Sequence, residues 1–487
     1  MTVVLVAAAA VAVGATRTTP VPAIAQPATV VPLSRTSLAC PAVGDTGRPG
    51  SDTSYGVLPL RSASGGGARG RITTRVAPAK VLGKGAATTH ATPPFDLGGT
   101  RRGTWSTRTV KGIKTATLLF GTHGALAPGL GAFDATTAKS QAGGGLAVAA
   151  CTPPARSWTF VGAGSTVDHG GVVVLVNPDP TQAVATVTLS DRNGPVETVG
   201  GNGLVVPPSG SVVVPLAKIA AGVDDLAVSV QLSSGRVSAA LLDTWVTGVQ
   251  PQGTEWMPGA ATPSTTTMIG SVPVGAARTL LVANPGDRTA DVHVDVVAAD
   301  GTFPATGLTQ LEVGPGSVAT AKLPASFGSK PVALRLRSSY PVTASVRVVT
   351  KGANPDIAYA PASVPLSGAA AVPAALAPAG SPTQIVLTAV NPDTATTARV
   401  TAFDAGGNQV GSMPVSVPAG QTVAVAPRSK LAKSVSVPWR KVSYLVVDPA
   451  APVVASAVYR SGSTGVSILP LTVAPTQVLA PGVRPAR

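Results

Sequence analysis

The chain has few aromatic residues, few acids and only two cysteines. Its 487 residues include 7 Phe, 5 Trp and 5 Tyr, and 21 acids stand against 36 Lys and Arg. Scarce aromatic rings disfavour a single-stranded nucleic-acid groove or an extended sugar-binding platform, because both bind by stacking. The formal net charge of +15 indicates a polyanionic neighbour, for which an anionic membrane surface or an acidic wall polymer fits better than nucleic acid.

Long apolar runs are also missing beyond the N-terminus. The run from Val3 to Ala15 suits the core of a signal peptide better than a full membrane span of about 20 residues. Small-x-small cleavage motifs end at Ala15 and Ala25, and the sequence leaves open whether residues 1–25 are removed or stay as an N-terminal membrane anchor. We therefore expect an extracytoplasmic protein, either secreted or anchored to the cytoplasmic membrane.

The two cysteines are Cys40 and Cys151. In an exported chain an even number favours a disulfide, although two buried free thiols also fit the sequence. Two thiols and four scattered histidines lack the spacing of a zinc site, so we expect neither a metal nor a cofactor.

A phrase of apolar residues interrupted by Asn-Pro occurs three times. The pairs begin at Asn177, Asn284 and Asn391, and each lies 107 residues after the one before. About thirty residues later each unit has two apolar runs around a Pro/Gly turn, as in VVPPSGSVVV (Val205 to Val214). About sixty residues after the Asn comes an alternating pair of runs, as in LAVSVQLSSGRVSAALL (Leu226 to Leu242), which predicts a closing hairpin. These landmarks define a repeating unit.

Each unit offers about six or seven short strands without a convincing helix, the number typical of an immunoglobulin-like sandwich. We predict an all-β fold of tandem immunoglobulin-like β-sandwich modules of about 107 residues, with a β-propeller as the alternative because short, even strands also suit its blades. The expected organisation is a signal peptide or anchor at 1–25, a basic N-terminal β region at 26–150 that forms a degenerate repeat, repeats at 151–250, 251–352 and 353–465, and a C-terminal tail at 466–487.

Several phrases together resemble a known family. They are GGLAVAACTPPARSWTFVGAG, VVVLVNPDPTQAVATV, GRVSAALLDTW and EWMPGAATP, and their order and spacing are similar to DUF5719, an uncharacterised family of exported actinobacterial envelope proteins. The likeness runs from about Thr115 to Arg460 and departs in the third unit, where Tyr359 stands in place of Trp158 and Trp256. It implies an actinobacterial extracytoplasmic protein and brings no established activity.

Motifs that could carry catalysis are incomplete. Asp45-Thr46-Gly47 resembles half of an aspartic-protease site, but the second half is missing. Asp168-His169 could orient a nucleophile, yet the chain contains no Gly-x-Ser-x-Gly elbow, so a polar turn before a buried strand is favoured. The three Asn-Pro pairs could form a ligand array, but an Asn that bonds nearby backbone and a Pro that ends a ladder more simply make a strand corner.

Positive charge gathers ahead of the clear repeats. Eleven basic residues and one acid, Asp96, lie between Arg61 and Lys114, in a stretch rich in Gly, Ser and Thr that indicates solvent-facing side chains. We expect these residues to contact anionic lipid or an acidic wall polymer, although a merely solubilising surface also fits. They are Arg61, Arg69, Arg71, Arg75, Lys80, Lys84, Arg101, Arg102, Arg108, Lys111 and Lys114.

Two functions compete at this point. The first is a non-catalytic envelope protein, a modular β scaffold that binds or spaces a partner such as another envelope protein. The second is an accessory protein or enzyme of cell-wall glycan metabolism, with a site assembled across modules. A pocket with two carboxylates about 5–10 Å apart would favour the second, and a smooth modular surface would favour the first.

Overall fold

The structure is a computed structural model that describes residues 26–42, 52–60, 68–83, 97, 99–111, 117–138, 145–248, 250–274, 277–324, 330–352, 354–431, 435–462 and 465–482. Nearly all secondary structure in these residues is β-strand, which confirms the all-β class. The chain divides into two compact units. In one, β1 (Gln26–Pro32) pairs antiparallel with β36 (Gln477–Gly482); the other, Leu33–Thr476, contains the remaining strands. The expected N-terminal signal or anchor lies outside the described residues.

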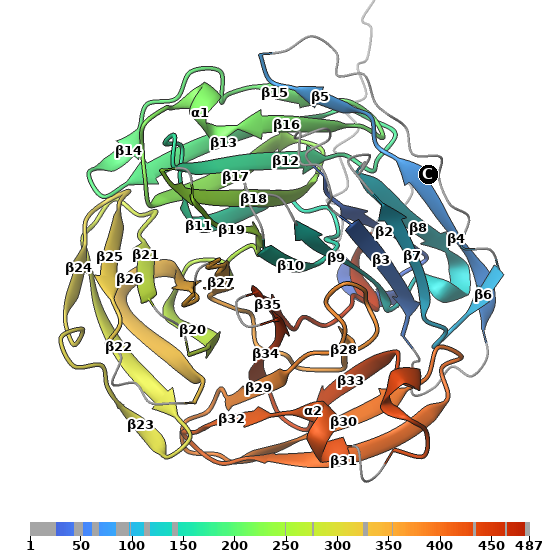
Figure 1. Ribbon diagram of the computed structural model, residues 1–487. Coiled ribbons are helices and arrows are strands. Elements are labelled where there is room, and N and C mark those ends of the chain that lie inside the picture. Colours follow the sequence, from blue (N-terminus) through green and yellow to red (C-terminus); the bar gives the residue numbers. More distant parts are fainter. Residues whose placement is uncertain are drawn as a thin grey trace, which may run out of the picture. The chain divides into compact units, whose positions relative to one another are not determined.

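Within the larger unit, the N-terminal region forms two four-stranded sheets, which we call the N-terminal sandwich (Figure 1). One sheet contains, in order, β2 (Arg35–Cys40), β8 (Leu118–His123), β4 (Arg69–Val76) and β6 (Gly99–Arg101); the other contains β10 (Gly145–Ala150), β9 (Leu130–Ala138), β3 (Asp52–Pro59) and β7 (Ser106–Lys111).

The first repeat forms a second pair of sheets, the first sandwich. One contains β11 (Ser157–Ala163), β17 (Leu226–Ser234), β13 (Ala183–Asp191), β14 (Gly194–Val196) and β15 (Leu204–Val206); the other contains β19 (Gln250–Met257), β18 (Ser238–Thr247), β12 (His169–Val176), β16 (Ser211–Pro215) and β5 (Ala79–Val81). Val173 and Leu175 of β12 share one buried core with Val187 and Leu189 of β13, so the sheets pack face to face. β5 comes from the N-terminal region and joins the edge of β16 in parallel.

The second and third repeats form the second and third sandwiches. In the second sandwich, one long strand, β26 (Val332–Val349), belongs to both sheets. The first half of β26 pairs with β20 (Ser264–Val272) and β22 (Ala290–Ala298), and β22 also pairs with β23 (Gly301–Pro304) and β24 (Leu311–Val313). The second half of β26 pairs with β21 (Ala277–Ala283) and β27 (Ile357–Pro361), and β21 also pairs with β25 (Val318–Lys322). The third has β28 (Ala370–Pro373), β33 (Tyr444–Pro449), β30 (Thr396–Phe403) and β31 (Gln409–Val417) opposite β32 (Thr422–Val425), β29 (Gln384–Ala389), β34 (Val453–Ser461) and β35 (Gly465–Pro470).

The expected closing hairpins are wrong. β17 and β18 follow each other in the chain but pair in opposite sheets, and β33 and β34 do the same. In the second sandwich a single strand, β26, runs from one sheet into the other. Alternation of apolar and polar residues shows that a strand has one buried face. It does not show which neighbouring strands form hydrogen bonds with it. The modules are two-sheet sandwiches rather than propeller blades, and the structure does not confirm an immunoglobulin-like strand order.

The Asn-Pro pairs stand where the chain crosses between sheets. Asn177 is buried; its amide donates to the carbonyl oxygens of Thr181 and Val206, at 2.7 and 3.2 Å. Its side-chain oxygen accepts from the backbone N–H of Asp179. Asn284 makes the equivalent bonds, so the side chain replaces ladder bonds that the turning backbone gives up.

The last strand of each sandwich lies toward the middle of the larger unit (Figure 1). These strands contact one another in cyclic order, β10 with β19, β19 with β27, β27 with β35, and β35 with β10. β19 and β27 begin close to the expected module boundaries at 250 and 352. Each strand pairs within the sandwich before its boundary, β19 in the first sandwich and β27 in the second. Residues 466–487, expected to form a tail, include most of β35, which the third sandwich needs as its inner strand.

One carboxylate joins the four inner strands. Asp356 is buried and accepts the N–H of Leu146 from β10 and of Val466 from β35, both at 2.9 Å, and that of Ile357 at 3.0 Å. The backbone of Thr254 in β19 also bonds to it. Burial raises the pKa of Asp356 to about 7, and these N–H donors oppose that rise.

We expect Asp356→Asn to destabilise the fold by about 2–5 kcal/mol, because the amide keeps one acceptor oxygen and turns an NH2 group toward buried N–H donors. Urea unfolding of the full chain measures this change. Asp300→Asn, in an exposed turn, is the matched control and should change stability by less than about 0.5 kcal/mol. Equal stability of the two variants would contradict a central role for Asp356.

Candidate functional site

The structure separates the predicted basic residues. Arg61, Lys84 and Lys114 lie outside the described residues, and of Lys111 only the backbone is described. Arg69, Arg71 and Arg75 are exposed on β4, where every second residue faces solvent and Ile72 and Thr74 between them are buried. The remaining exposed members are Lys80 on β5, Arg101 on β6 and Arg108 on β7.

Arg102 does not face solvent. Its guanidinium donates to the carbonyl oxygens of Leu60 and Pro128, at 2.8 and 2.9 Å, and the residue is buried. Burial lowers the pKa of Arg102. The surface expectation is therefore wrong for this residue, because the turn after β6 points neighbouring side chains in opposite directions, with Arg101 outward and Arg102 into the sandwich.

Cys40 and Cys151 form a disulfide. Cys40 ends β2 in one sheet of the N-terminal sandwich, and Cys151 follows β10 in the other, with a backbone bridge between Ala39 and Thr152 beside the bond. The bond thus closes one sandwich from its first strand to its last. In the chain-entropy treatment, a crosslink over 111 residues stabilises by roughly 4–5 kcal/mol.

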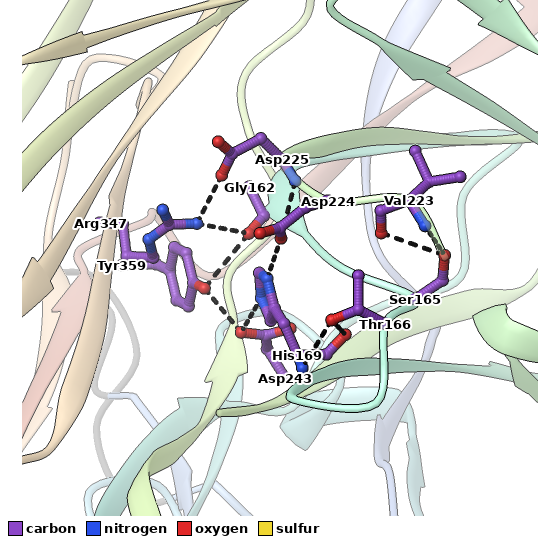
Figure 2. A network of polar contacts seen from close by, with 10 residues as sticks. All are labelled: Gly162, Ser165, Thr166, His169, Val223, Asp224, Asp225, Asp243, Arg347 and Tyr359. Carbon is purple, nitrogen blue, oxygen red and sulfur yellow. Dashed lines mark hydrogen bonds and ion pairs between the residues drawn. The ribbon is translucent and has the colours of Figure 1, made fainter. Parts of the chain in front are cut away.

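A polar cluster surrounds the buried side chain of His169 at the start of β12 (Figure 2). The imidazole Nε2 donates to Oδ2 of Asp243 on β18 at 2.9 Å, and Nδ1 pairs with Asp224 in the loop before β17. The indole of Trp245 stacks on the imidazole at 4.7 Å between ring centroids. His169 is 1% exposed, so the first sandwich holds a cation in its interior.

Two residues of the second sandwich complete this cluster. The Tyr359 hydroxyl on β27 donates to the same Oδ2 of Asp243 at 2.6 Å. Arg347 on β26 donates to Oδ1 of Asp225 at 2.7 Å, and its guanidinium lies 4.2 Å from the centroid of the Trp245 ring. Figure 2 shows Arg347 and Tyr359 converging on the carboxylates from one side. The cluster therefore fastens the second sandwich to the first.

The neighbouring carboxylates keep His169 charged. Burial alone would lower the pKa of His169, but the charge and hydrogen bond of Asp243, with those of Asp224, outweigh it and raise the pKa to about 9. Both ring nitrogens then act as donors, which agrees with an acceptor carboxylate on each side. Burial tends to raise the pKa of Asp224, yet its hydrogen bond to His169 brings the net pKa below the ordinary value.

This chemistry holds parts together rather than turning over a substrate. A general base needs a free lone pair, whereas a protonated imidazole between two carboxylates has none. Ser165 and Thr166, the nearby hydroxyls, bond the backbone of Val223 and His169. The protease-like Asp45-Thr46-Gly47 lies outside the described residues.

Other buried carboxyl groups lie at the centre of the larger unit. Burial raises the pKa of Asp134 on β9 to about 8, and burial with the charge of Asp356 raises that of Glu255 on β19 well above its ordinary value. Both residues are at most 2% exposed, so they offer no open pair of catalytic carboxylates. A hollow of about 280 Å³ beside Arg460 and Gln384 has no carboxylate in its lining.

The described part of the chain has neither a cluster of metal-binding side chains nor a membrane-spanning helix. No group of three or more His, Cys, Asp or Glu side chains there is arranged to hold a metal ion. The helices described are short, and none is long and apolar enough to cross a membrane.

Sequence reasoning named His169 but missed its partners. The signal was present in GRVSAALLDTW, where Asp243 interrupts an apolar run on a strand whose neighbours Leu241 and Leu242 are buried. A charged residue at such a position requires a partner. Arg347 gave the same signal inside the run VTASVRVV, but nothing in one sequence connects two positions in different modules.

The comparisons with known proteins concern family and likeness only. The family model described as "Family of unknown function (DUF5719)" matches residues 106–428, which takes in parts of all four sandwiches. The curated proteins contain no match. Among solved structures, "Crystal Structure of Thermotoga maritima 1070" has 16% sequence identity and a TM-score of 0.18, and the match covers 21% of this chain and 94% of that chain. So low a TM-score carries no argument.

We expect His169→Gln to lower the free energy of unfolding by about 3–5 kcal/mol, because the charge of Asp243 stays buried without its cation. With a folded pKa raised to about 9, the stabilisation from His169 is fully present below pH 6.5 and lost as pH rises through about 9. The difference between wild type and variant should therefore be smaller at pH 10 than at pH 7, measured by urea unfolding.

The matched control is Asp168→Asn, which changes the exposed neighbour of His169 and should leave stability unchanged. A difference between wild type and His169→Gln that stays constant from pH 7 to pH 10 would contradict a charged His169 in the folded state.

Proposed function

Because the chain belongs to the DUF5719 family, whose function is unknown, we propose that it is a non-catalytic protein of the cell envelope. It is a modular β scaffold that presents a basic surface to an acidic wall polymer. The observation that carries the proposal is the distribution of charge. The acids Asp134, Asp243, Glu255 and Asp356 are buried, while the arginines of β4 face solvent.

The junctions between modules support a scaffold. Asp356 receives backbone donors from the inner strands, and the His169 cluster spans the first and second sandwiches. Further polar bonds cross other junctions: Arg101 donates to the carbonyl oxygen of Gly406, and Tyr444 donates to that of Gly103. Because these bonds hold the sandwiches together, the binding surfaces on them keep a fixed geometry. A scaffold that binds a polymer of repeating units requires such a fixed geometry.

The buried chemistry supports a non-catalytic role. The ionisable side chains with strongly shifted pKa values, His169, Asp134, Glu255 and Asp356, are all nearly free of solvent contact. Catalytic groups need access to substrate as well as a shifted pKa. The exposed arginines of β4 remain available to meet an acidic partner.

Localisation in the envelope rests on the apolar run from Val3 to Ala15, together with a disulfide between Cys40 and Cys151. Disulfides persist in oxidising compartments and are rare in the cytosol. An acidic wall polymer is then the abundant polyanion within reach of a chain of net charge +15.

Binding to acidic polymer tests this function directly. The full chain should sediment with isolated wall polymer at about 20 mM salt and be released at about 500 mM salt, because screening shortens the reach of surface charges. The same fractionation of native envelopes shows whether the chain leaves with salt alone. Recovery in the unbound fraction at low salt, or retention that high salt does not change, would contradict binding through charge.

A further inference from the structure

Strand pairing gathers cations that are far apart in the sequence. Arg35 at the start of β2 lies opposite His123 at the end of β8. The pairing of β8 with β4 reaches Thr122 and Ile72, and one step further along the same register places Arg71 beside His123. Arg35, His123 and Arg71 therefore form one row across three strands, and all three are exposed.

A second row extends this cluster. Arg69 on β4 lies directly opposite Arg101 on β6. Arg75 lies on the same face of β4, two and three alternate positions from Arg71 and Arg69 respectively. With neighbouring strands about 4.8 Å apart, these side chains cover a face about 15 Å wide. We call Arg35, Arg69, Arg71, Arg75, Arg101 and His123 the arginine face.

Like charges in register repel each other. Two cations placed directly opposite on neighbouring strands destabilise the sheet. In the part of the chain that the structure describes, Arg35, Arg69 and Arg75 form no ion pair with an acid. Binding of an external anion would relieve this repulsion between the cations and so stabilise the sheet.

The residues on the surface between the cations are small and mostly polar. Ser37, Gly121 and Thr73 lie side by side across β2, β8 and β4, since Ser37 pairs with Gly121 and Gly121 with Thr73. The Thr73 hydroxyl donates to the carbonyl oxygen of Gly121 at 3.1 Å. The large apolar side chains exposed in the described residues lie on other strands and in loops outside this sheet. An extended polymer chain can lie across this surface, but none of these side chains would insert into the hydrocarbon core of a membrane.

We propose that the arginine face is the binding site of a linear acidic polymer, whose repeated oxyanion groups are held by the arginine forks. This inference rests on the proposed function and locates it. Five of the six side chains are arginines, and a planar guanidinium binds phosphate or carboxylate oxygens through two parallel hydrogen bonds. Polymer is favoured over membrane because the face lacks apolar or aromatic residues that anchor a protein at a lipid interface.

The test compares two triple variants of the full chain with equal charge change. Arg35→Gln/Arg69→Gln/Arg71→Gln alters the arginine face and leaves Arg101, which bonds Gly406, in place. Arg156→Gln/Arg192→Gln/Lys218→Gln removes three exposed cations of the first sandwich. Fluorescence anisotropy with labelled polyphosphate and labelled polyglutamate, and sedimentation with phosphatidylglycerol vesicles, measure binding at low salt.

We expect the arginine-face variant to bind polymer about 100-fold more weakly than wild type, since each basic contact contributes about fivefold. The control variant should lose less than about threefold, because its cations lie on the first sandwich and outside the arginine face. A stronger effect on polyphosphate assigns phosphate as the oxyanion, and a stronger effect on polyglutamate assigns carboxylate. If the Gln variant fails to unfold cooperatively, Arg35→Lys/Arg69→Lys/Arg71→Lys replaces it and should bind about fivefold more weakly, because lysine keeps charge without the fork.

Two results would overturn this inference, and the first of them would leave the proposed function intact. Equal losses in both triple variants would show that binding follows net charge and not the arginine face. Tighter binding to vesicles than to either polymer, lost in the arginine-face variant, would make a membrane the occupant. Wild-type protein that binds neither polymer at low salt would remove the proposed function itself.

Discussion

The carboxylate of Asp356 is the contact on which the arrangement of the four sandwiches depends. Its oxygens collect the N–H groups of Leu146, Ile357 and Val466, and the backbone of Thr254 adds a fourth bond. In each of the other three inner strands a glycine comes directly before the residue that donates its N–H. These glycines are Gly145, Gly253 and Gly465. A Cβ on Gly145 would lie 2.3 Å from the Asp356 carboxylate, and one on Gly253 would lie 2.6 Å from it, so absent side chains on these two strands make room for the carboxylate. Without that carboxylate, buried donors would face one another with no acceptor.

This centre makes the modules interdependent rather than a linear string. The repeat of 107 residues describes each sandwich, but the contacts that hold the sandwiches together break the repetition, since one strand has an acid where the others have glycine. The His169 cluster does the same at a second junction, with Arg347 and Tyr359 supplied by the neighbouring sandwich. Units with a shared spacing of landmarks therefore assemble through residues that are not repeated.

This division explains how much the sequence could predict. The spacing of Asn177, Asn284 and Asn391 predicts the repeat, and alternation predicts β-strands, because both depend on local backbone chemistry. Sheet partners and the inner strands depend on contacts between distant segments, so the closing hairpins were assigned to the wrong pairing. The basic cluster was visible as composition, yet Arg102 turned inward, and Arg35 and His123 entered the face only through strand register.

The same burial that builds the centre shapes the surface charge. Burial raises the pKa of Asp134 to about 8, so this acid is largely protonated at pH 7, and burial also raises the pKa of Glu255 well above its ordinary value. Each protonated acid removes one negative charge from the formal balance of +15, and the folded chain is accordingly more positive than its composition states. Asp243 and Asp356 are engaged inside the fold by His169 and by the inner strands, so neither is available to Arg35, Arg69 or Arg75. The protonated interior acid and the exposed arginine face therefore both add to the positive charge that a polyanion meets.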